Sequence, residues 1–520
     1  MKLEEYPFKL SPDPHQLKYL QEHAQDKAFG LLWQMGVAKS KAVIDNACLL
    51  YKQGKINGVL IVAPTGVDLN WLLEELPKHI PDSIRKESRI FRFSSKKAKT
   101  KASKEECKWI QEHWGLSWLI LNYDAFMTMD GKEVALSFCD KREVFYILDE
   151  SSVIKTPKAK RTQRIVRTAW RAKYRRILEG TPITNGAIDI YKQVEFLDPT
   201  FWKRHGWDSP LAFKTYFHEY ADKPQTYWYR DKTTGTMKKT EVQVCVGYKN
   251  LEELNRLIQP ITSRLLKKDV LNLPPKIYEP RYFELSREQR ELYDKLAKEF
   301  CIELEKDEGV ITAPLAIVRM LRLHQISCGY VPIETEDPED EPLYVIPGQN
   351  PRLNALEDLI DTITTPTIIW CKYRLDMKLI KEVFKRKANR CKVAVYDAQE
   401  SEEAKLKAKQ DFQEGRVDWL LTTQSAMSRG HTLHRAENCI YYSNGMNLAM
   451  RQQSEDRAHR RGVEHPVTYI DLLGENTIDK RIMLNLCSKM DTSDAILGDI
   501  PGVDMRQALR EWLYEDNRLS

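Results

Sequence analysis

The sequence has no long apolar run, and this absence excludes several classes of protein. No stretch approaches the roughly 20 apolar residues that a membrane-spanning helix needs, so we expect no membrane partner. The first residues, MKLEEYPFKL, contain no apolar signal-peptide core. We therefore expect a cytoplasmic protein rather than a secreted one.

Paired cysteines and a large net charge are also missing. The ten cysteines are scattered singly and none forms a CxxC pair, which argues against zinc ribbons and redox pairs and favours reduced thiols. The 81 lysines and arginines exceed the 75 acidic residues by only six. An anionic partner is therefore indicated only if the excess is concentrated in particular segments.

Two segments do concentrate positive charge. The first contains Lys96, Lys97, Lys99, Lys101 and Lys104 with no acid between them. The second contains Lys155, Lys158, Lys160, Arg161, Arg164 and Arg167, and is extended by Arg171, Lys173, Arg175 and Arg176. Either run could be a solvated surface, but both lie near the phosphate-chemistry motifs described below. Together they favour a nucleic-acid partner.

The apolar residues, 42% of 520, are sufficient for the cores of two or three domains. Strand-length apolar runs without strict alternation are typical of strands buried on both faces of a parallel sheet. Such runs are GVLIVAP (58–64), WLILNY (118–123), VFYILDE (144–150), TIIWCKY (367–373), CKVAVYDA (391–398), VDWLLTTQ (417–424), CIYYSN (439–444) and VTYIDLL (467–473). Helical patterns separate them, so two α/β lobes are predicted. Between the two predicted lobes, an aromatic-rich segment at about 200–262 contains a predicted β-hairpin around DKTTGT.

A phosphate-binding loop is the first motif that carries chemistry. The strand-like GLLWQM (30–35) leads into Gly36, Ala38, Lys39 and Ser40 and then into a helical pattern. Backbone N–H groups at a helix N-terminus favour phosphates, a lysine reaches them, and a serine hydroxyl can bind Mg²⁺. Ala38 stands where glycine is usual, but a residue entering a helix needs no positive φ, so we expect it to be tolerated. The alternative is an ordinary helix start with a surface lysine.

Two further motifs have the charges that phosphoryl chemistry uses. Asp149 and Glu150 end the run VFYILDE, where an Asp can hold Mg²⁺ and a Glu can orient or deprotonate the attacking water; the alternative is a solvated strand end. Arg457 and Arg460 lie in a helical pattern, QQSEDRAHRRG (452–462). At spacing i, i+3 they would share one helix face and could act as arginine fingers. The alternative is an exposed charged helix.

Taken in order, these motifs resemble those of the Snf2 family of helicase superfamily 2, in its compact viral or bacterial form. The resemblance covers about residues 11–475. The similar segments are HQLKYL (15–20), MGVAKS (35–40), IVAP (61–64) with NWLLEEL (70–76), LDESSVIK (148–155), LEGTPITN (178–185), SRLLKKDVLNLPPK (263–276), TTQSAMSRGHTL (422–433) and DRAHRRG (456–462).

The resemblance implies an α/β fold with two RecA-like lobes, each built on a parallel sheet, plus family-type insertions. We expect an N-terminal ATP-binding lobe over residues 1–275, with its insertion at about 200–262. A C-terminal helicase lobe should follow over residues 276–475, with a linker or insertion at about 286–350. A C-terminal helical brace is expected over residues 476–520.

The resemblance also implies a set of site residues that use ATP and Mg²⁺. Gln16 would contact adenine, and Ser40 and Asp149 would hold Mg²⁺. The remaining nucleotide contacts would come from Gly36, Val37, Ala38, Lys39 and Ser40 in the first lobe and from Gly430 and Gln453 in the second. The residues expected to act in hydrolysis are Lys39, Asp149, Glu150, Arg457 and Arg460.

The implied function is that of an ATP-dependent DNA translocase or remodelling motor. It would be a DNA-dependent ATPase, a monomer in the cytoplasm of a bacterium or a virus-infected host cell, that tracks along duplex or branched DNA. Two alternatives stay open. One is a helicase that separates strands of DNA or RNA, and the other is a weakly hydrolysing DNA-binding clamp, which the altered phosphate loop would permit.

Overall fold

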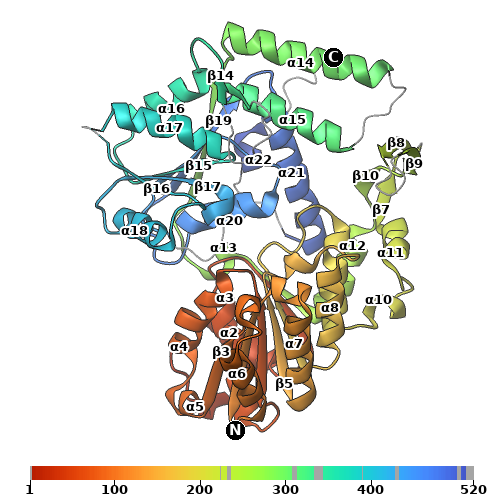
Figure 1. Cartoon of the computed structure of the whole chain (residues 1–520). Coiled ribbons are helices and arrows are strands. Elements are labelled where there is room, and N and C mark those ends of the chain that lie inside the picture. The colour runs from red at the N-terminus through yellow and green to blue at the C-terminus, as the bar shows by residue number, and fades with distance from the viewer. Residues whose placement is uncertain are drawn as a thin grey trace. The chain divides into compact units, whose positions relative to one another are not determined.

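The computed structural model describes residues 3–222, 224–230, 236–306, 313–332, 343–388, 391–427, 433–499 and 505–510 (Figure 1). The chain forms two compact units. The first comprises Met1–Phe217, Tyr248–Asn272 and Thr492–Asp499, and the second comprises His218–Gly247, Leu273–Asp491 and Ile500–Ser520. Across the described ranges, no helix is both long and apolar enough to span a membrane.

The first unit is built on a seven-stranded parallel sheet with the order β11-β1-β6-β5-β2-β4-β3. Its strands are β1 (Ala28–Trp33), β2 (Gly58–Ala63), β3 (Ser88–Arg92), β4 (Leu116–Asn122), β5 (Val144–Asp149), β6 (Tyr174–Leu178) and β11 (Thr262–Leu265). Successive strand residues face opposite sides of a sheet. In β2, Val59 and Ile61 pack in one apolar core, and Leu60 and Val62 pack in another. Burial on both faces explains why these strands are continuous apolar runs.

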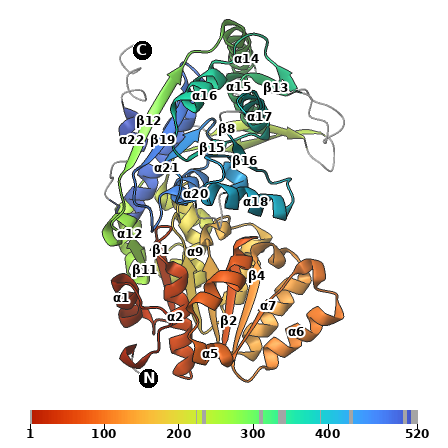
Figure 2. The same ribbon diagram turned by 90° about the vertical axis from the view of Figure 1, so that its left-hand side faces the viewer.

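Helices cover both faces of this sheet, and Figure 2 shows α2 and α7 on opposite sides of it. The longer helices are α1 (Pro14–His23), α2 (Lys39–Lys52), α6 (Lys101–Glu112), α7 (Met129–Lys141), α8 (Lys160–Ala169), α9 (Tyr191–Leu197), α11 (Pro210–Phe217) and α12 (Leu251–Ile258). Short helices are α3 (Val67–Asn70), α4 (Leu76–His79), α5 (Asp82–Lys86), α10 (Phe201–Arg204) and α13 (Lys267–Val270).

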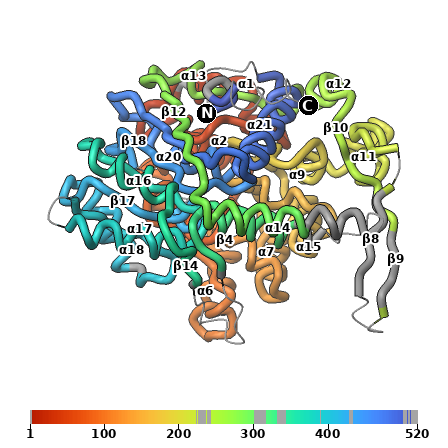
Figure 3. Tube along the Cα trace, turned by 90° about the horizontal axis from the view of Figure 1, so that it is seen from above, coloured from red at the N-terminus to blue at the C-terminus, as the bar shows by residue number. Residues whose placement is uncertain are grey.

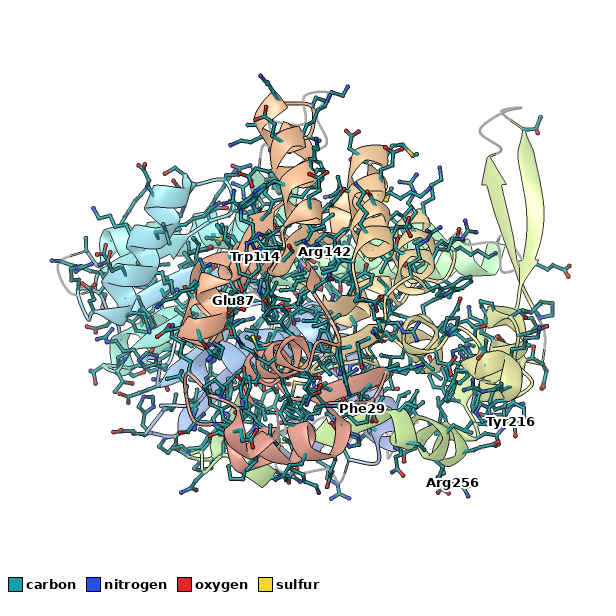
Figure 4. The ribbon with its side chains drawn as sticks, turned by 90° about the horizontal axis from the view of Figure 1, so that it is seen from below. Phe29, Glu87, Trp114, Arg142, Tyr216 and Arg256 are labelled. Carbon is teal, nitrogen blue, oxygen red and sulfur yellow. The ribbon has the colours of Figure 1, made fainter. Side chains whose placement is uncertain are left out.

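One arginine holds together the loops at the amino ends of the strands. Arg142, at the start of β5, donates to the carbonyl oxygens of Asn57 at 2.8 Å and Gly115 at 3.2 Å. Figure 4 shows it in the same region as Glu87 and Trp114, on the underside of the molecule. The Arg142 side chain thus occupies the amino ends of the strands, whereas parallel α/β sheets bind ligands at the opposite, carboxyl ends.

The second unit has a six-stranded parallel sheet with the order β12-β19-β18-β15-β17-β16. Its strands are β12 (Lys276–Phe283), β15 (Thr367–Cys371), β16 (Val393–Tyr396), β17 (Trp419–Thr423), β18 (Asn438–Tyr441) and β19 (Val467–Gly474). Strand pairs outside the two large sheets are β7 (His218–Tyr220) with β10 (Cys245–Tyr248), β8 (Gln225–Arg230) with β9 (Met237–Val242), and β13 (Tyr330–Pro332) with β14 (Leu343–Val345).

Helices surround the second sheet, and α14 and α15 lie beside each other at its margin (Figures 1 and 3). The helices are α14 (Arg287–Lys306), α15 (Ala313–Ser327), α16 (Pro351–Thr362), α17 (Arg374–Arg386), α18 (Glu402–Gln413), α19 (Gln424–Met427), α20 (Leu448–Ala458), α21 (Ile478–Leu497) and α22 (Met505–Ala508). Helix α21 begins in the second unit, and its residues from Thr492 onwards belong to the first.

The predicted fold class, α/β with two parallel sheets, is confirmed. Each of the eight apolar runs overlaps a strand, and β8 and β9 pair in antiparallel fashion on either side of the predicted turn, whose residues 231–235 lie outside the described part. The domain boundaries stay predictions. Residues 218–247 group with the second unit, although the sequence placed the whole segment at 200–262 in the first lobe.

Part of the second basic run has a structural role instead of a nucleic-acid one. Arg176 lies in β6, which no apolar run predicted, and its side chain is fully buried. Its Nε donates to the Tyr19 hydroxyl at 2.7 Å and its Nη2 to the His23 carbonyl at 2.9 Å. The interpretation of Arg176 as a nucleic-acid contact is therefore wrong.

A buried ion pair joins three helices of the second unit. Arg352 of α16 is fully buried and pairs with Asp479 of α21, while Nε2 of His324 in α15 lies 3.3 Å from an Asp479 oxygen. Burial would raise the pKa of Asp479, but Arg352 and His324 outweigh it and hold that pKa below its usual value. The pair thus fixes α15, α16 and α21 to one another.

We expect Arg352→Met to destabilise the second unit by about 3–5 kcal/mol, because it leaves a buried carboxylate without its partner. Arg386→Met is the matched control, since Arg386 forms an exposed pair with Glu357 at 3.3 Å and should cost less than about 1 kcal/mol. Calorimetric unfolding of the full chain makes the comparison. Equal losses in the two variants would contradict this account of Arg352.

Candidate nucleotide site

The phosphate loop connects β1 to α2 at the carboxyl edge of the first sheet. Helix α2 starts at Lys39, so the loop occupies residues 34–38. The Lys39 ammonium donates to the carbonyl oxygens of Trp33 at 2.8 Å and Gln34 at 3.3 Å. It is thereby held over the loop in front of a 14-residue helix, whose N-terminus favours anions.

The loop bends through two residues with left-handed backbone. Gly36 has φ 83° and Ala38 has φ 54° and ψ 47°. The expectation that Ala38 needs no positive φ is therefore wrong. A side chain in this region costs roughly 1–2 kcal/mol relative to the right-handed one, so Ala38 is strained where a glycine would not be.

Helix α1 supports the strained loop from one side. The Gln16 amide donates to the Ala38 carbonyl at 3.0 Å, and its Oε1 accepts from the Asp13 backbone at 2.8 Å. Nε2 of His15 lies 3.2 Å from the Val37 carbonyl oxygen. The Val37 side chain is buried in the core, so only its backbone belongs to the loop surface. Gln16 thus has a loop-bracing role, and its contact with adenine stays a prediction.

Asp149 and Glu150 lie at the same edge because of the strand register. Leu178 of β6 pairs with Leu31 of β1 on one side and with Asp149 of β5 on the other. Strands β5 and β6 therefore end level, and β1 continues two residues further, to Trp33, which brings the phosphate loop and the acidic pair to the same edge of the sheet. Glu150 follows with φ 53°, a left-handed conformation that turns the chain sharply after the strand.

The Asp149 carboxylate is held by donors on both oxygens. The Trp71 indole donates to Oδ2 at 2.8 Å, and the Glu150 backbone donates to Oδ1 at 3.1 Å. The Tyr123 hydroxyl fixes the strand end by donating to the Asp149 carbonyl at 2.8 Å. Burial raises the pKa of Asp149, whereas the Trp71 hydrogen bond and the Lys39 charge oppose that rise.

A third carboxylate, Glu179, connects this acidic loop to the end of β6. Its Oε2 accepts from the Ser152 backbone at 2.7 Å, and its Oε1 accepts from the Gly180 and Thr181 backbones at 2.9 and 3.0 Å. Sequence reasoning missed Glu179, Trp71 and Tyr123 as site residues. For Glu179 a signal existed, because it is the one acidic residue of the quoted motif LEGTPITN.

The remaining predicted residues belong to the second unit. Helix α20 ends at Ala458, so it includes Arg457 and the half-buried Gln453, whereas Arg460 lies in the bend beyond it. The two arginines therefore do not share one helix face as predicted. The alternative of an exposed charged helix is also wrong for Arg457, which is 2% exposed. Gly430 lies outside the described residues.

Helix α20 is anchored by a buried charge network. Glu455 accepts from Lys276 and from Arg451, each at 2.9 Å, and Arg451 also pairs with Asp471. Burial would raise the pKa of Glu455, but Lys276 and Arg451 lower it to about 2. The network fixes the helix against β12 and β19 and so fixes the position of Arg457 within the second unit.

The first basic run keeps its charge on the surface. All five lysines are exposed; they are Lys96, Lys97, Lys99, Lys101 and Lys104. Lys101, at the start of α6, lies 3.9 Å from Glu105 in a pair that is too exposed and too long to neutralise it strongly. The segment therefore remains available to an anionic partner.

Comparison with known families agrees with this arrangement of motifs. The SNF2-related domain matches residues 15–329, more than half of the chain, and the helicase conserved C-terminal domain matches residues 351–462. The chain belongs to the SNF2-related family. The match includes the phosphate loop, the acidic pair and the 179–181 turn, and the C-terminal match includes α20 and both arginines.

Several known proteins are similar over much of the chain. YwqA of Bacillus subtilis, named as an ATP-dependent helicase/translocase, is 24% identical over 72% of this chain and 38% of its own. The TATA-binding protein-associated factor MOT1 of Saccharomyces cerevisiae is 24% identical over 72% of this chain and 22% of its own. The chain thus spans less than two fifths of these relatives. The Sulfolobus solfataricus SWI2/SNF2 ATPase core, solved with dsDNA, is 20% identical with 98% coverage of both chains and a TM-score of 0.40.

The strained Ala38 generates a prediction. We expect Ala38→Gly to stabilise the first unit by up to about 1 kcal/mol, because relief of the left-handed strain exceeds the added chain entropy. Gly36→Ala is the control and should destabilise, since it introduces the same strain at φ 83°. Thermal unfolding measures both. A lower melting temperature for Ala38→Gly would show that the alanine is not strained.

Proposed function

We propose that the chain is a DNA-dependent ATPase that moves along duplex DNA as an Snf2-type translocase. The observation that carries the proposal is the parallel register of the neighbouring strands β1, β6 and β5. It brings the Lys39 loop, the Asp149–Glu150 pair and the Glu179 turn to one edge of the sheet. This edge is where parallel α/β sheets bind ligands, and the family model includes the same segments.

The residues at this edge fit ATP with Mg²⁺. Gly36 gives the loop its close backbone, Lys39 supplies a cation at a helix N-terminus, and both suit phosphate oxygens. The Ser40 hydroxyl and the Asp149 carboxylate are hard oxygen donors of the kind that Mg²⁺ takes. When bound, Mg²⁺ would neutralise charge on the phosphates.

The chemical roles divide among the chain's own residues. We assign the phosphate-facing charge to Lys39, with Gly36, Val37, Ala38 and Ser40 cradling the nucleotide and Gln16 facing adenine. We assign Glu150, the residue that follows the end of β5 at Asp149, to orient or deprotonate the attacking water.

The second unit contributes positive charge to the reaction. We assign Arg457 and Arg460 to the phosphoryl group in its transition state, with Arg457 fixed by the last turn of α20 and Arg460 placed by the bend that follows. Gln453 and Gly430 are proposed as further nucleotide contacts. Because Arg457 is buried and Arg460 is not, their substitution should affect folding differently.

DNA is the proposed partner because of family membership and the exposed lysines at 96–104. Contacts of lysines with phosphates hold the backbone without reading its sequence, as a translocating motor requires. We further propose that the motor is compact, monomeric and of viral or bacterial type. Its two lobes would meet near residue 275, and a C-terminal brace would begin at residue 476.

Hydrolysis should depend on Lys39 and Glu150. We expect Lys39→Ala and Glu150→Gln each to lower DNA-stimulated ATPase activity by at least about 10²-fold, because they remove charge stabilisation and water activation. Glu150→Gln should still bind ATP. Glu143→Gln is the control, since Glu143 pairs with Lys173 at the opposite end of β5 and should leave the rate unchanged.

Near-normal ATPase activity in purified Lys39→Ala would overturn the assignment of this site. A wild-type chain that binds DNA but hydrolyses no ATP would favour the clamp. If the wild-type chain separated the strands of a forked duplex in a strand-separation assay, the helicase would be favoured.

A further inference from the structure

A buried tryptophan contacts the carboxylate that the proposed function assigns to Mg²⁺. Trp71 is 1% exposed, and its indole N–H donates to Oδ2 of Asp149 at 2.8 Å. Hydrogen bonds to an ionised acceptor are stronger than those between neutral groups. Burial also keeps water from competing for the bond, so the contact constrains Asp149 strongly.

The backbone at Trp71 is unusual in a way that aims this side chain. Residues 67–79 form one continuous helical run, α3 followed by α4, and between them Trp71–Glu75 form a π-helical turn. A π turn holds more residues than an α turn, so it changes the direction in which side chains leave the helix, and such turns are frequent at functional sites.

The start of the run is fixed to the sheet. Asp68 is fully buried; its Oδ1 accepts from the Gly66 backbone at 2.8 Å and its Oδ2 accepts from Arg92 of β3 at 2.7 Å. Three residues later the helix presents Trp71. The indole therefore projects from a support that is itself held by a charge pair whose carboxylate is buried, and it can act as a fixed donor.

The hydrogen bonds on Asp149 leave a defined part of its carboxylate available. Each oxygen of an ionised carboxylate can accept about two hydrogen bonds. Oδ2 uses one acceptor site for Trp71, and Oδ1 uses one for the Glu150 backbone. With one donor on each oxygen, rotation of the carboxylate would break both bonds.

We propose that Trp71 is a positioning residue that holds the Asp149 carboxylate in the orientation in which its free acceptor sites serve Mg²⁺. The inference deepens the proposed function and rests on it. Partners of this kind, one step removed from a metal, typically contribute about 10- to 100-fold to metal affinity. Trp71 would thus act on the metal-dependent part of nucleotide binding and not on nucleotide binding in general.

The chain offers a matched control for this role. Trp118 of β4 is fully buried, and its indole N–H has no hydrogen-bond partner among the described residues. Trp71→Phe and Trp118→Phe remove the same atoms from buried positions in the same unit. Only Trp71→Phe removes a hydrogen-bond donor from Asp149. A difference in Mg²⁺ dependence between the two variants therefore reports the hydrogen bond and not the loss of packing.

The experiment measures the affinity of the full chain for ADP by calorimetry, once with saturating Mg²⁺ and once with EDTA. In wild type, Mg²⁺ should tighten ADP binding. In Trp71→Phe, the affinity for ADP with Mg²⁺ should be about 10- to 100-fold lower than in wild type. Its affinity for ADP with EDTA should equal that of wild type. Trp118→Phe should match wild type in both. The Mg²⁺ concentration for half-maximal ATPase activity should rise only in Trp71→Phe.

A second arm places Trp71→Phe in an Asp149→Asn background, where it should have no further effect on the Mg²⁺ dependence if it acts through Asp149. Equal Mg²⁺ dependence in Trp71→Phe and Trp118→Phe would overturn the inference, and so would equal weakening of ADP binding with and without Mg²⁺. A wild-type chain with no ADP affinity would instead overturn the proposed function, and the inference with it.

Discussion

The register of a parallel sheet is the constraint on which the candidate site depends. Leu178 pairs with Leu31 and with Asp149, so β5 and β6 end level and β1 ends two residues beyond them. Each end then leads into a segment with polar chemistry: the phosphate loop, the acidic pair and the Glu179 turn. A slip of one residue in β5 would turn Asp149 to the other face, so the apolar cores on both faces of the sheet hold this register.

The segments after the strands are strained, and buried polar side chains stabilise them. Ala38 and Glu150 both adopt left-handed backbone, which is costly for residues with side chains. Gln16 braces the first turn through the Ala38 carbonyl, and Tyr123 and Glu179 brace the second through backbone groups. Strain of this kind is typical of functional sites, where the surrounding structure determines the conformation.

Much of the fold, and the motif segments that meet at the carboxyl edge of the first sheet, could be predicted, because long apolar runs and short motifs are local signals. What escaped prediction depends on contacts distant in sequence. Strand β6 was missed because Arg175 and Arg176 suggested a surface, yet Arg176 is buried against Tyr19 and His23. Trp71 was part of a quoted motif, but its partner Asp149 is 78 residues away. Backbone geometry, which composition does not encode, also escaped prediction. It ends α20 between Arg457 and Arg460, and it sets the φ of Ala38.

The central claim is that this edge hydrolyses ATP in response to DNA. The most direct measurement is the steady-state ATPase rate of the wild-type chain with and without duplex DNA over a series of salt concentrations. The account predicts that duplex DNA raises the rate. It also predicts that apparent DNA affinity falls with salt by a slope of about 0.9 per contacted phosphate on logarithmic axes. An equal rate without nucleic acid, or a DNA response that salt does not change, would contradict it.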